Sequence, residues 1–432
     1  MRRGFPQLAL GTTAVLACRL LGQQTQPPSP TIKVDVRQVL VPLVVTDKEG
    51  HHLTGLTRAD FKAFEDGVEQ TITAFSAQSS GLATVDSAAA RAEPLPGTIP
   101  DTSGPRPARR TYLIVIDTLH TAFPNFVHLR EALKKLFREE QAGDSQYGVM
   151  AMARSLQIVQ NTTQDPAAVL KAIESRDFQK VLQGSQQSQL KNELDRFRQA
   201  LDEARAACDR RDMDCDPKRR FLPPQANAIA EFDRNLTTAY LRQFRFLIEQ
   251  LTHTTGRRTV VLISDGFSLS PGKAALEYLA AYFPENRSAA LQANERMQDE
   301  FEPVVRLAAA NNIPIYTIDS RGLYTNEYFD ASNRGSTPRM GPAVQTIISD
   351  VALSEGDTLA EMANATGGTV YHKSNDLLTG LKRAFADGRE YYTLAYVSTN
   401  ANLDGKFRAI RIEVRDRKAV VNAKRGYWAV GN

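Results

Sequence analysis

The stretch Tyr112-Leu-Ile-Val-Ile-Asp117-Thr-Leu-His-Thr121 decides the fold of this chain. An apolar run stops at a carboxylate, hydroxyls follow at Thr118 and Thr121, and a helical pattern begins soon afterwards. A continuous apolar run of this length is typical of a strand buried on both faces, as in a parallel sheet covered by helices. Ligands of such sheets bind at the carboxyl ends of the strands. The sequence therefore places Asp117 at a ligand-binding edge, with His120 within hydrogen-bonding reach.

Strand and helix patterns alternate around this stretch through residues 110–388. Further strands are expected at 148–152, 156–159, 260–263, 313–318 and 369–371, the first two of them paired through a tight connection. Helices are expected at 236–251, 289–310 and 359–365, and another opens at Asp165-Pro166. This alternation predicts an α/β domain with a doubly wound, mostly parallel sheet and one antiparallel edge.

The two ends of the chain are rich in strand patterns. Residues 31–76 and 389–430 show the alternation of apolar and polar residues that is typical of half-buried strands. Each segment is too short to close a good core, so we expect both to pack together as one β-sandwich that holds the α/β domain as an insertion. Residues 77–109 are rich in Ala, Ser, Gly and Pro, which predicts a flexible linker.

Residues 178–232 interrupt the α/β pattern, because they are rich in Gln, Arg, Asp and Lys and poor in large apolar residues. They predict a solvated helix near 190–210, followed by a loop through Pro217, Pro223 and Pro224. An insertion that decorates the domain is the favoured interpretation, and an arm that binds a partner at the site edge is the alternative. Two cysteines, at positions 208 and 215, form either a local disulfide or two unpaired thiols.

The N-terminus resembles an export signal, residues 1–22. Arg2 and Arg3 precede an apolar stretch that is shorter than the ~20 residues of a membrane span. Val15-Leu-Ala-Cys18 resembles a lipobox and would leave a lipid anchor at Cys18, whereas cleavage after Gly22 would release a soluble protein. We expect an exported protein that is periplasmic, associated with the cell envelope or secreted.

Composition excludes several classes of function. Hydrophobic residues make up 42% of the chain and charged residues 24%, as in ordinary globular proteins. The net charge of +4 comes without a clustered basic stripe, so we expect no nucleic-acid partner. The sequence has no Gly-x-Ser-x-Gly elbow, phosphate loop or His-Glu-x-x-His motif, and Asp117-Thr-Leu lacks the second carboxylate of phosphoaspartate-forming phosphatases. We therefore expect a protein that is not an enzyme.

Short motifs in a characteristic order and spacing carry a family resemblance from residue 34 to residue 428, apart from the linker and the insertion. They are Val44-Val-Thr-Asp-Lys-Glu-Gly50, Leu56-Thr-Arg-Ala-Asp-Phe61, Glu65-Asp-Gly67, Val115-Ile-Asp-Thr-Leu-His-Thr121, Leu262-Ile-Ser-Asp-Gly266, Tyr316-Thr-Ile-Asp319, Ala365-Thr-Gly-Gly368, Ser374-Asn-Asp376, Tyr391-Tyr392 and Lys424-Arg-Gly-Tyr427. With these motifs the chain resembles the exported bacterial von Willebrand factor type A (VWFA)-related proteins of the acidobacterial type.

The resemblance implies a divalent-cation site. VWFA domains that bind metal use an Asp-x-Ser-x-Ser motif, a later Thr and a further Asp, which suits the oxygen coordination of Mg²⁺ or Mn²⁺. It assigns Asp117, Thr121 and Asp265 to three of these roles, with Thr163 as a fourth metal ligand. Leu119 replaces the first Ser of the motif and offers no oxygen. Two hypotheses follow: a degenerate cation site that takes a carboxylate from a partner, or a domain that binds partners without metal.

The expected function is protein–protein or extracellular-matrix binding at the carboxyl edge of the central sheet. The alternatives are a hydrolase at the same edge and a metal-independent structural subunit of an envelope complex. Contact with the membrane is expected only through the lipid anchor at Cys18.

Overall fold

The computed structural model describes residues 38–79, 82–86, 110–141, 143–183, 187–292, 296–323 and 342–430. The predicted export signal, Cys18 and positions 87–109 of the predicted linker lie outside these ranges. None of the helices in the described part of the chain is long and apolar enough to cross a membrane.

The central sheet has six strands in the order β11-β10-β9-β6-β7-β8. These strands are β6 (Arg110–Asp117), β7 (Ser145–Met152), β8 (Leu156–Thr163), β9 (Arg257–Ser264), β10 (Ile315–Asp319) and β11 (Val370–Tyr371). All neighbouring pairs are parallel except β7 and β8. The prediction of a mostly parallel sheet with one antiparallel edge is therefore confirmed.

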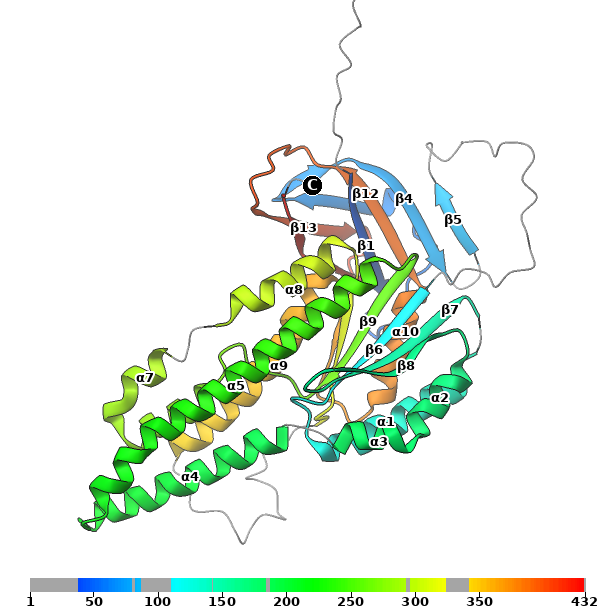
Figure 1. Ribbon diagram of the computed structural model, residues 1–432. Helices are drawn as coiled ribbons and strands as arrows, with labels where there is room; N and C mark the ends of the chain where they lie inside the picture. The colour runs from blue at the N-terminus through cyan, green and yellow to red at the C-terminus, as the bar shows by residue number, and fades with distance from the viewer. Residues whose placement is uncertain are drawn as a thin grey trace, which may run out of the picture. The chain divides into compact units, whose positions relative to one another are not determined.

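Helices cover both faces of this sheet (Figure 1). On one face lie α1 (Phe123–Glu139), α2 (Pro166–Glu174), α3 (Arg176–Gln183) and α10 (Leu377–Arg389). On the other lie α5 (Cys215–Thr252), α8 (Gln298–Ala310) and α9 (Pro342–Thr366). Side chains of β6 alternate between the two layers: Ile114 and Ile116 pack with the first, Leu113 and Val115 with the second. Burial on both faces explains why the run from Tyr112 is continuously apolar.

Strands from the two ends of the chain pair with one another in two further sheets. One has the order β14-β1-β12-β4-β5 and the other β15-β13-β2-β3. Their bounds are β1 (Gln38–Thr46), β2 (Phe61–Glu65), β3 (Val68–Gln70), β4 (Ile72–Ser79), β5 (Leu82–Asp86), β12 (Tyr391–Val397), β13 (Phe407–Val414), β14 (Val420–Ala423) and β15 (Gly426–Trp428). A short 3-10 helix, η1 (Arg58–Asp60), follows Thr57.

One hydrophobic cluster joins the two sheets and contains Val41 of β1, Phe61 of β2, Leu394 of β12 and Ile410 of β13. Neither end of the chain therefore forms its core alone. The structure differs from the predicted linker at its start, because β4 continues to Ser79 and β5 pairs with it. Backbone pairing with β4 extends the sheet despite the small residues of this segment.

The predicted solvated insertion is wrong in two respects. First, α5 runs through Pro223 and Pro224, where a loop was expected. Each proline in a helix interior costs about 3 kcal/mol, so tertiary packing must compensate. Leu222, Ala226 and Ile229 supply that packing, because they recur at helical spacing and are buried.

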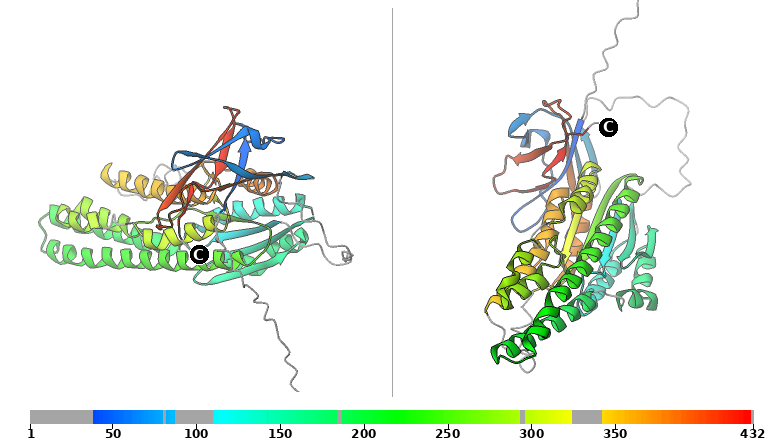
Figure 2. Two further views of the ribbon diagram at one scale, coloured as in Figure 1. Left: turned by 90° about the horizontal axis from the view of Figure 1, so that it is seen from above. Right: turned by 60° about the vertical axis from the view of Figure 1, so that its left-hand side comes forward.

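Second, the insertion has a core of its own. Phe197 and Leu201 of α4 (Gln187–Asp209) pack with α5 and with α6 (Lys273–Tyr282). Figures 1 and 2 show α4 beside the first half of α5. Cys208 and Cys215 form a disulfide at the turn between these two helices. The remaining elements are η2 (Pro284–Asn286) and α7 (Arg287–Gln292).

Candidate functional site at the carboxyl edge

Asp117 ends β6 and is fully buried. Its Oδ1 accepts hydrogen bonds from the backbone N–H groups of Leu119 (2.9 Å) and His120 (3.0 Å). Its Oδ2 accepts the Ser264 hydroxyl at 2.7 Å and lies 2.9 Å from Nδ1 of His120. Four donors of the protein therefore occupy both oxygens, and Asp117 caps the turn that follows its strand.

His120 stands beside Asp117, and its exposed fraction is 4%. A carboxylate can only accept, so Nδ1 carries the proton of this hydrogen bond. Burial works against the imidazolium, but the charge and hydrogen bond of Asp117 outweigh it, and the pKa of His120 is raised. The ring meets Tyr240 edge-on at 4.9 Å, and its Nε2 is buried with no hydrogen-bond partner among the described residues.

Asp265 follows β9 and draws three loops together. Its Oδ2 accepts the backbone N–H of Ala122 and the amide of Asn125, both at 2.8 Å, and its Oδ1 accepts the Ser320 hydroxyl at 2.6 Å. The backbone N–H of Asp265 donates to Thr121 Oγ1 at 3.2 Å. Burial raises the pKa of Asp265 to about 6, although these hydrogen bonds lower it. The structure thus brings Thr121 and Asp265 together next to Asp117.

Ser264, Ser320 and Asn125 are not among the predicted site residues, although each hydrogen-bonds an acid of this edge. The signal was available for the two serines, because Ser264 directly precedes Asp265 and Ser320 directly follows Asp319 at strand ends. Nothing in the sequence pattern marks Asn125.

Arg321 fastens the loop after β10 to α9. It donates from Nε and Nη2 to the carboxylate of Asp319 at 3.0 and 2.8 Å, and from Nη1 to the carbonyl of Ala352 at 3.0 Å. A longer contact of 3.4 Å reaches Glu355. This bidentate pair is a rigid element of the edge rather than a free charge.

The structure does not bring Thr163, the predicted fourth metal ligand, together with the other three predicted ligands. Asp117 lies opposite Met152 at the carboxyl end of β7, whereas Thr163 lies opposite Tyr147 near the other end of that strand. Because β8 is antiparallel, its last residue returns to the amino edge of the sheet. Thr163 instead accepts the backbone N–H of Asp165 before α2.

The surroundings of the Asp117 carboxylate do not fit Mg²⁺ or Mn²⁺. These ions need several oxygen ligands with open lone pairs, yet each Asp117 oxygen already has two protein partners. Leu119 turns into the core with an exposed fraction of 1%. Among the described residues, no group of three or more His, Cys, Asp or Glu side chains is placed to hold a metal ion. A cation would first have to displace protein donors from Asp117.

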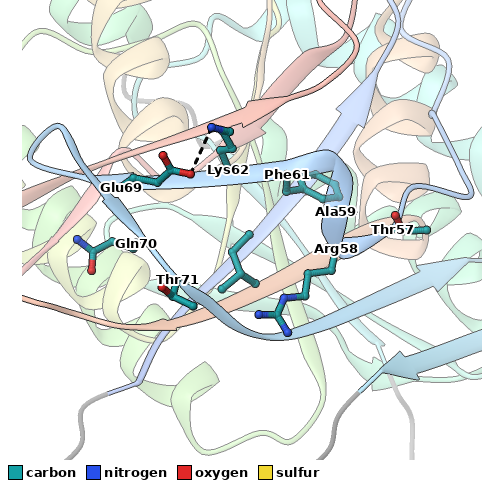
Figure 3. Close-up of a pocket in the computed structure, with 9 residues that line it drawn as sticks. Thr57, Arg58, Ala59, Phe61, Lys62, Glu69, Gln70 and Thr71 are labelled. Carbon is teal, nitrogen blue, oxygen red and sulfur yellow. Dashed lines mark ion pairs between the residues drawn. The ribbon is translucent and has the colours of Figure 1, made fainter.

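Away from this edge, a pocket lies on the sheets formed by the chain ends (Figure 3). It has a volume of 610 Å³, and its lining includes Arg58, Lys62, Glu69 and Gln70. Lys62 and Glu69 form an ion pair of 3.4 Å across β2 and β3. None of the predicted site residues contributes to this pocket.

No family model matches the sequence, and no curated protein matches it. Similar solved structures include BatB from Bacteroides thetaiotaomicron, with 11% identity, a TM-score of 0.27 and coverage of 64% of this chain and 98% of that chain. They also include a von Willebrand factor type A protein from Catenulispora acidiphila, with 8% identity, a TM-score of 0.31 and coverage of 85% and 75%. The PilB minor pilin from Streptococcus sanguinis has 9% identity, a TM-score of 0.31 and coverage of 82% and 88%. The neighbours thus include VWFA-containing proteins, but TM-scores this low carry no argument, and the fold rests on the strand order above.

Proposed function

We propose that this chain is an exported VWFA-related protein of the acidobacterial type that binds a protein or matrix partner at the carboxyl edge of its central sheet, without a metal ion and without catalysis. The observation that carries the proposal is a rigid, internally bonded edge next to exposed apolar residues. Phe123 follows the β6 loop with an exposed fraction of 43%, and Leu323 follows β10 with 61%. Exposed apolar side chains on a polar, ordered rim are typical of protein-binding surfaces.

The position of the edge supports the same role. Open α/β sheets bind ligands outside the carboxyl ends of their strands, where loops from several strands meet. Here the loops after β6, β9 and β10 are joined through Asp265, which receives bonds from Ala122 and Ser320. A preorganised surface loses little conformational entropy when a partner binds.

The wider architecture belongs to the same proposal. The α/β domain, 110–388, is inserted in a β-sandwich made from 31–76 and 389–430, and the pairing of β1 with β12 supports this arrangement. Export is supported by the signal-like residues 1–22 and by the disulfide between Cys208 and Cys215, which suits an oxidising compartment. Mass spectrometry of the mature N-terminus distinguishes a lipid anchor at Cys18 from cleavage after Gly22.

Capture of partners from envelope extract, with and without EDTA, tests the binding role. We expect the same partner in both conditions, with capture lost in Leu323→Asp and retained in Ile158→Asp. Ile158 is a matched control because it is 59% exposed on β8, away from the three joined loops. Loss of capture in EDTA, or heat of Mg²⁺ or Mn²⁺ binding that disappears in Asp117→Asn, would overturn the metal-independent proposal. Equal capture by the Leu323→Asp and Ile158→Asp proteins would exclude the edge as the binding surface.

A further inference from the structure

A cavity of 150 Å³ lies beside the carboxyl edge, under the insertion. His120 forms part of its wall, and α4, α5, α6 and α9 contribute Lys191, Asp233, Lys273 and Glu355. Lys191 is exposed, so the cavity reaches solvent along α4. The insertion therefore covers the edge and builds a compartment there, which a decorating insertion would not do.

Two carboxyl groups in this wall have few hydrogen bonds. Asp233 Oδ2 accepts the backbone N–H of Gly272 at 2.7 Å, and Glu355 has the long 3.4 Å contact with Arg321. Burial raises the pKa of Asp233 and raises that of Glu355 to about 7. The charge of Asp233 raises the pKa of Glu355 further, whereas His120 lowers the pKa of both acids. The lysine of α6, Lys273, pairs with Glu277 at 3.6 Å. Ionised carboxylates in such a site are stabilised by a cation that enters it.

The imidazole of His120 supplies an independent sign of a ligand. Its Nδ1 is bound to Asp117, and its Nε2, on the other side of the ring, is buried without a hydrogen-bond partner among the described residues. Buried polar atoms are nearly always satisfied, so an orphaned one in a cavity wall marks a place for a polar ligand. In the neutral ring with a proton on Nδ1, Nε2 is a hydrogen-bond acceptor.

We propose that this cavity binds a primary ammonium group, which donates its three hydrogen bonds to Asp233, Glu355 and Nε2 of His120. An alkylammonium has three donors and no acceptor, so its donors match two carboxylates and one imidazole nitrogen in number, and its charge is opposite in sign to that of the carboxylates. The group comes from a small free amine or from a lysine side chain of another protein. The site does not depend on the proposed partner surface, because a free amine alone suffices to test it.

Calorimetric titration of the full chain with n-butylamine tests the site at about pH 8.5, where carboxylates are ionised and a primary amine keeps its proton. We expect saturable binding of n-butylamine and no binding of n-butanol, its neutral analogue. Asp233→Asn and Glu355→Gln should each weaken binding by about tenfold or more, because each removes one charged partner. The matched control is Asp357→Asn, an exposed acid on the same helix as Glu355.

Thermal unfolding of each variant verifies that it is folded, and two separate carboxylate variants keep the test valid if one fails to fold. N-acetyl-lysine methylamide distinguishes the sources: binding of both compounds assigns a lysine side chain, and binding of n-butylamine alone assigns a free amine. Equal binding of n-butanol, or undiminished binding by a folded Asp233→Asn protein, would overturn the proposal. Either result would leave the capture experiments on Leu323 unaffected.

Discussion

A buried and a partly buried histidine–aspartate pair have almost the same N–O distance in different surroundings. His120 Nδ1 lies 2.9 Å from Asp117, three residues away in the same loop, and His52 Nε2 lies 2.8 Å from Asp387, at the far end of the sequence. Asp117 also accepts two backbone N–H groups and a hydroxyl. In the second pair, the other ring nitrogen of His52, Nδ1, lies 3.6 Å from a second carboxylate, that of Glu390. The first pair therefore organises one functional loop, and the second ties the N-terminal strands to α10.

The largest effect is expected at Asp117. Asp117→Ala leaves four buried donor groups of the edge without their acceptor, so the free energy of unfolding should fall by about 3–5 kcal/mol. Chemical denaturation measures this loss. Asp376→Ala is the matched control, because Asp376 accepts the backbone N–H and hydroxyl of Thr379 at the exposed start of α10. There the expected loss is about 1 kcal/mol, and equal losses at the two positions would contradict the role given to Asp117.

A smaller effect is expected at His52. His52→Ala removes a hydrogen bond to a carboxylate and should lower the free energy of unfolding by about 1.5–3 kcal/mol. His51→Ala serves as control, because the neighbouring His51 side chain is 80% exposed and pairs with Asp47 within its own turn. That change should stay within about 0.5 kcal/mol. If the two alanine variants unfold at the same denaturant concentration, His52 does not join the two parts of the chain.

The contrast between the pairs also shows what the sequence could predict. The continuous apolar run before Asp117 predicted β6 and placed Asp117 at the carboxyl edge, because this pattern is a local signal. The family resemblance assigned Asp265 to the same site, and bonds through Ser264 and Thr121 connect the two positions. The bond between His52 and Asp387 depends on segments 335 residues apart, for which the pattern gives no register. The position of Thr163 was predictable, since a tight turn after β7 sends β8 back to the amino edge.

The helical insertion was hidden for another physical reason. Its surface residues are so polar that a loop was expected, and Pro223 and Pro224 argued against a helix. Leu222, Ala226 and Ile229 are buried at helical spacing against α6, and this tertiary packing overrides local propensity. A search for apolar periodicity across the prolines would have found α5.

The smallest effect expected is the pH dependence of the His52 pair. The hydrogen bond that His52 donates to the Asp387 carboxylate raises the pKa of His52, against the opposing effect of burial. A histidine whose pKa is higher in the folded state contributes stability that is fully present below its unfolded value of about 6.5 and is lost as the pH rises through the folded value. The difference in unfolding free energy between wild type and His52→Gln should therefore be largest near about pH 5.5 and decrease by about pH 9. Other titrating groups, His120 included, occur in both proteins and cancel in this difference. Denaturation series at the two pH values measure it, and a constant difference would mean that a neutral His52 ring makes the hydrogen bond to Asp387.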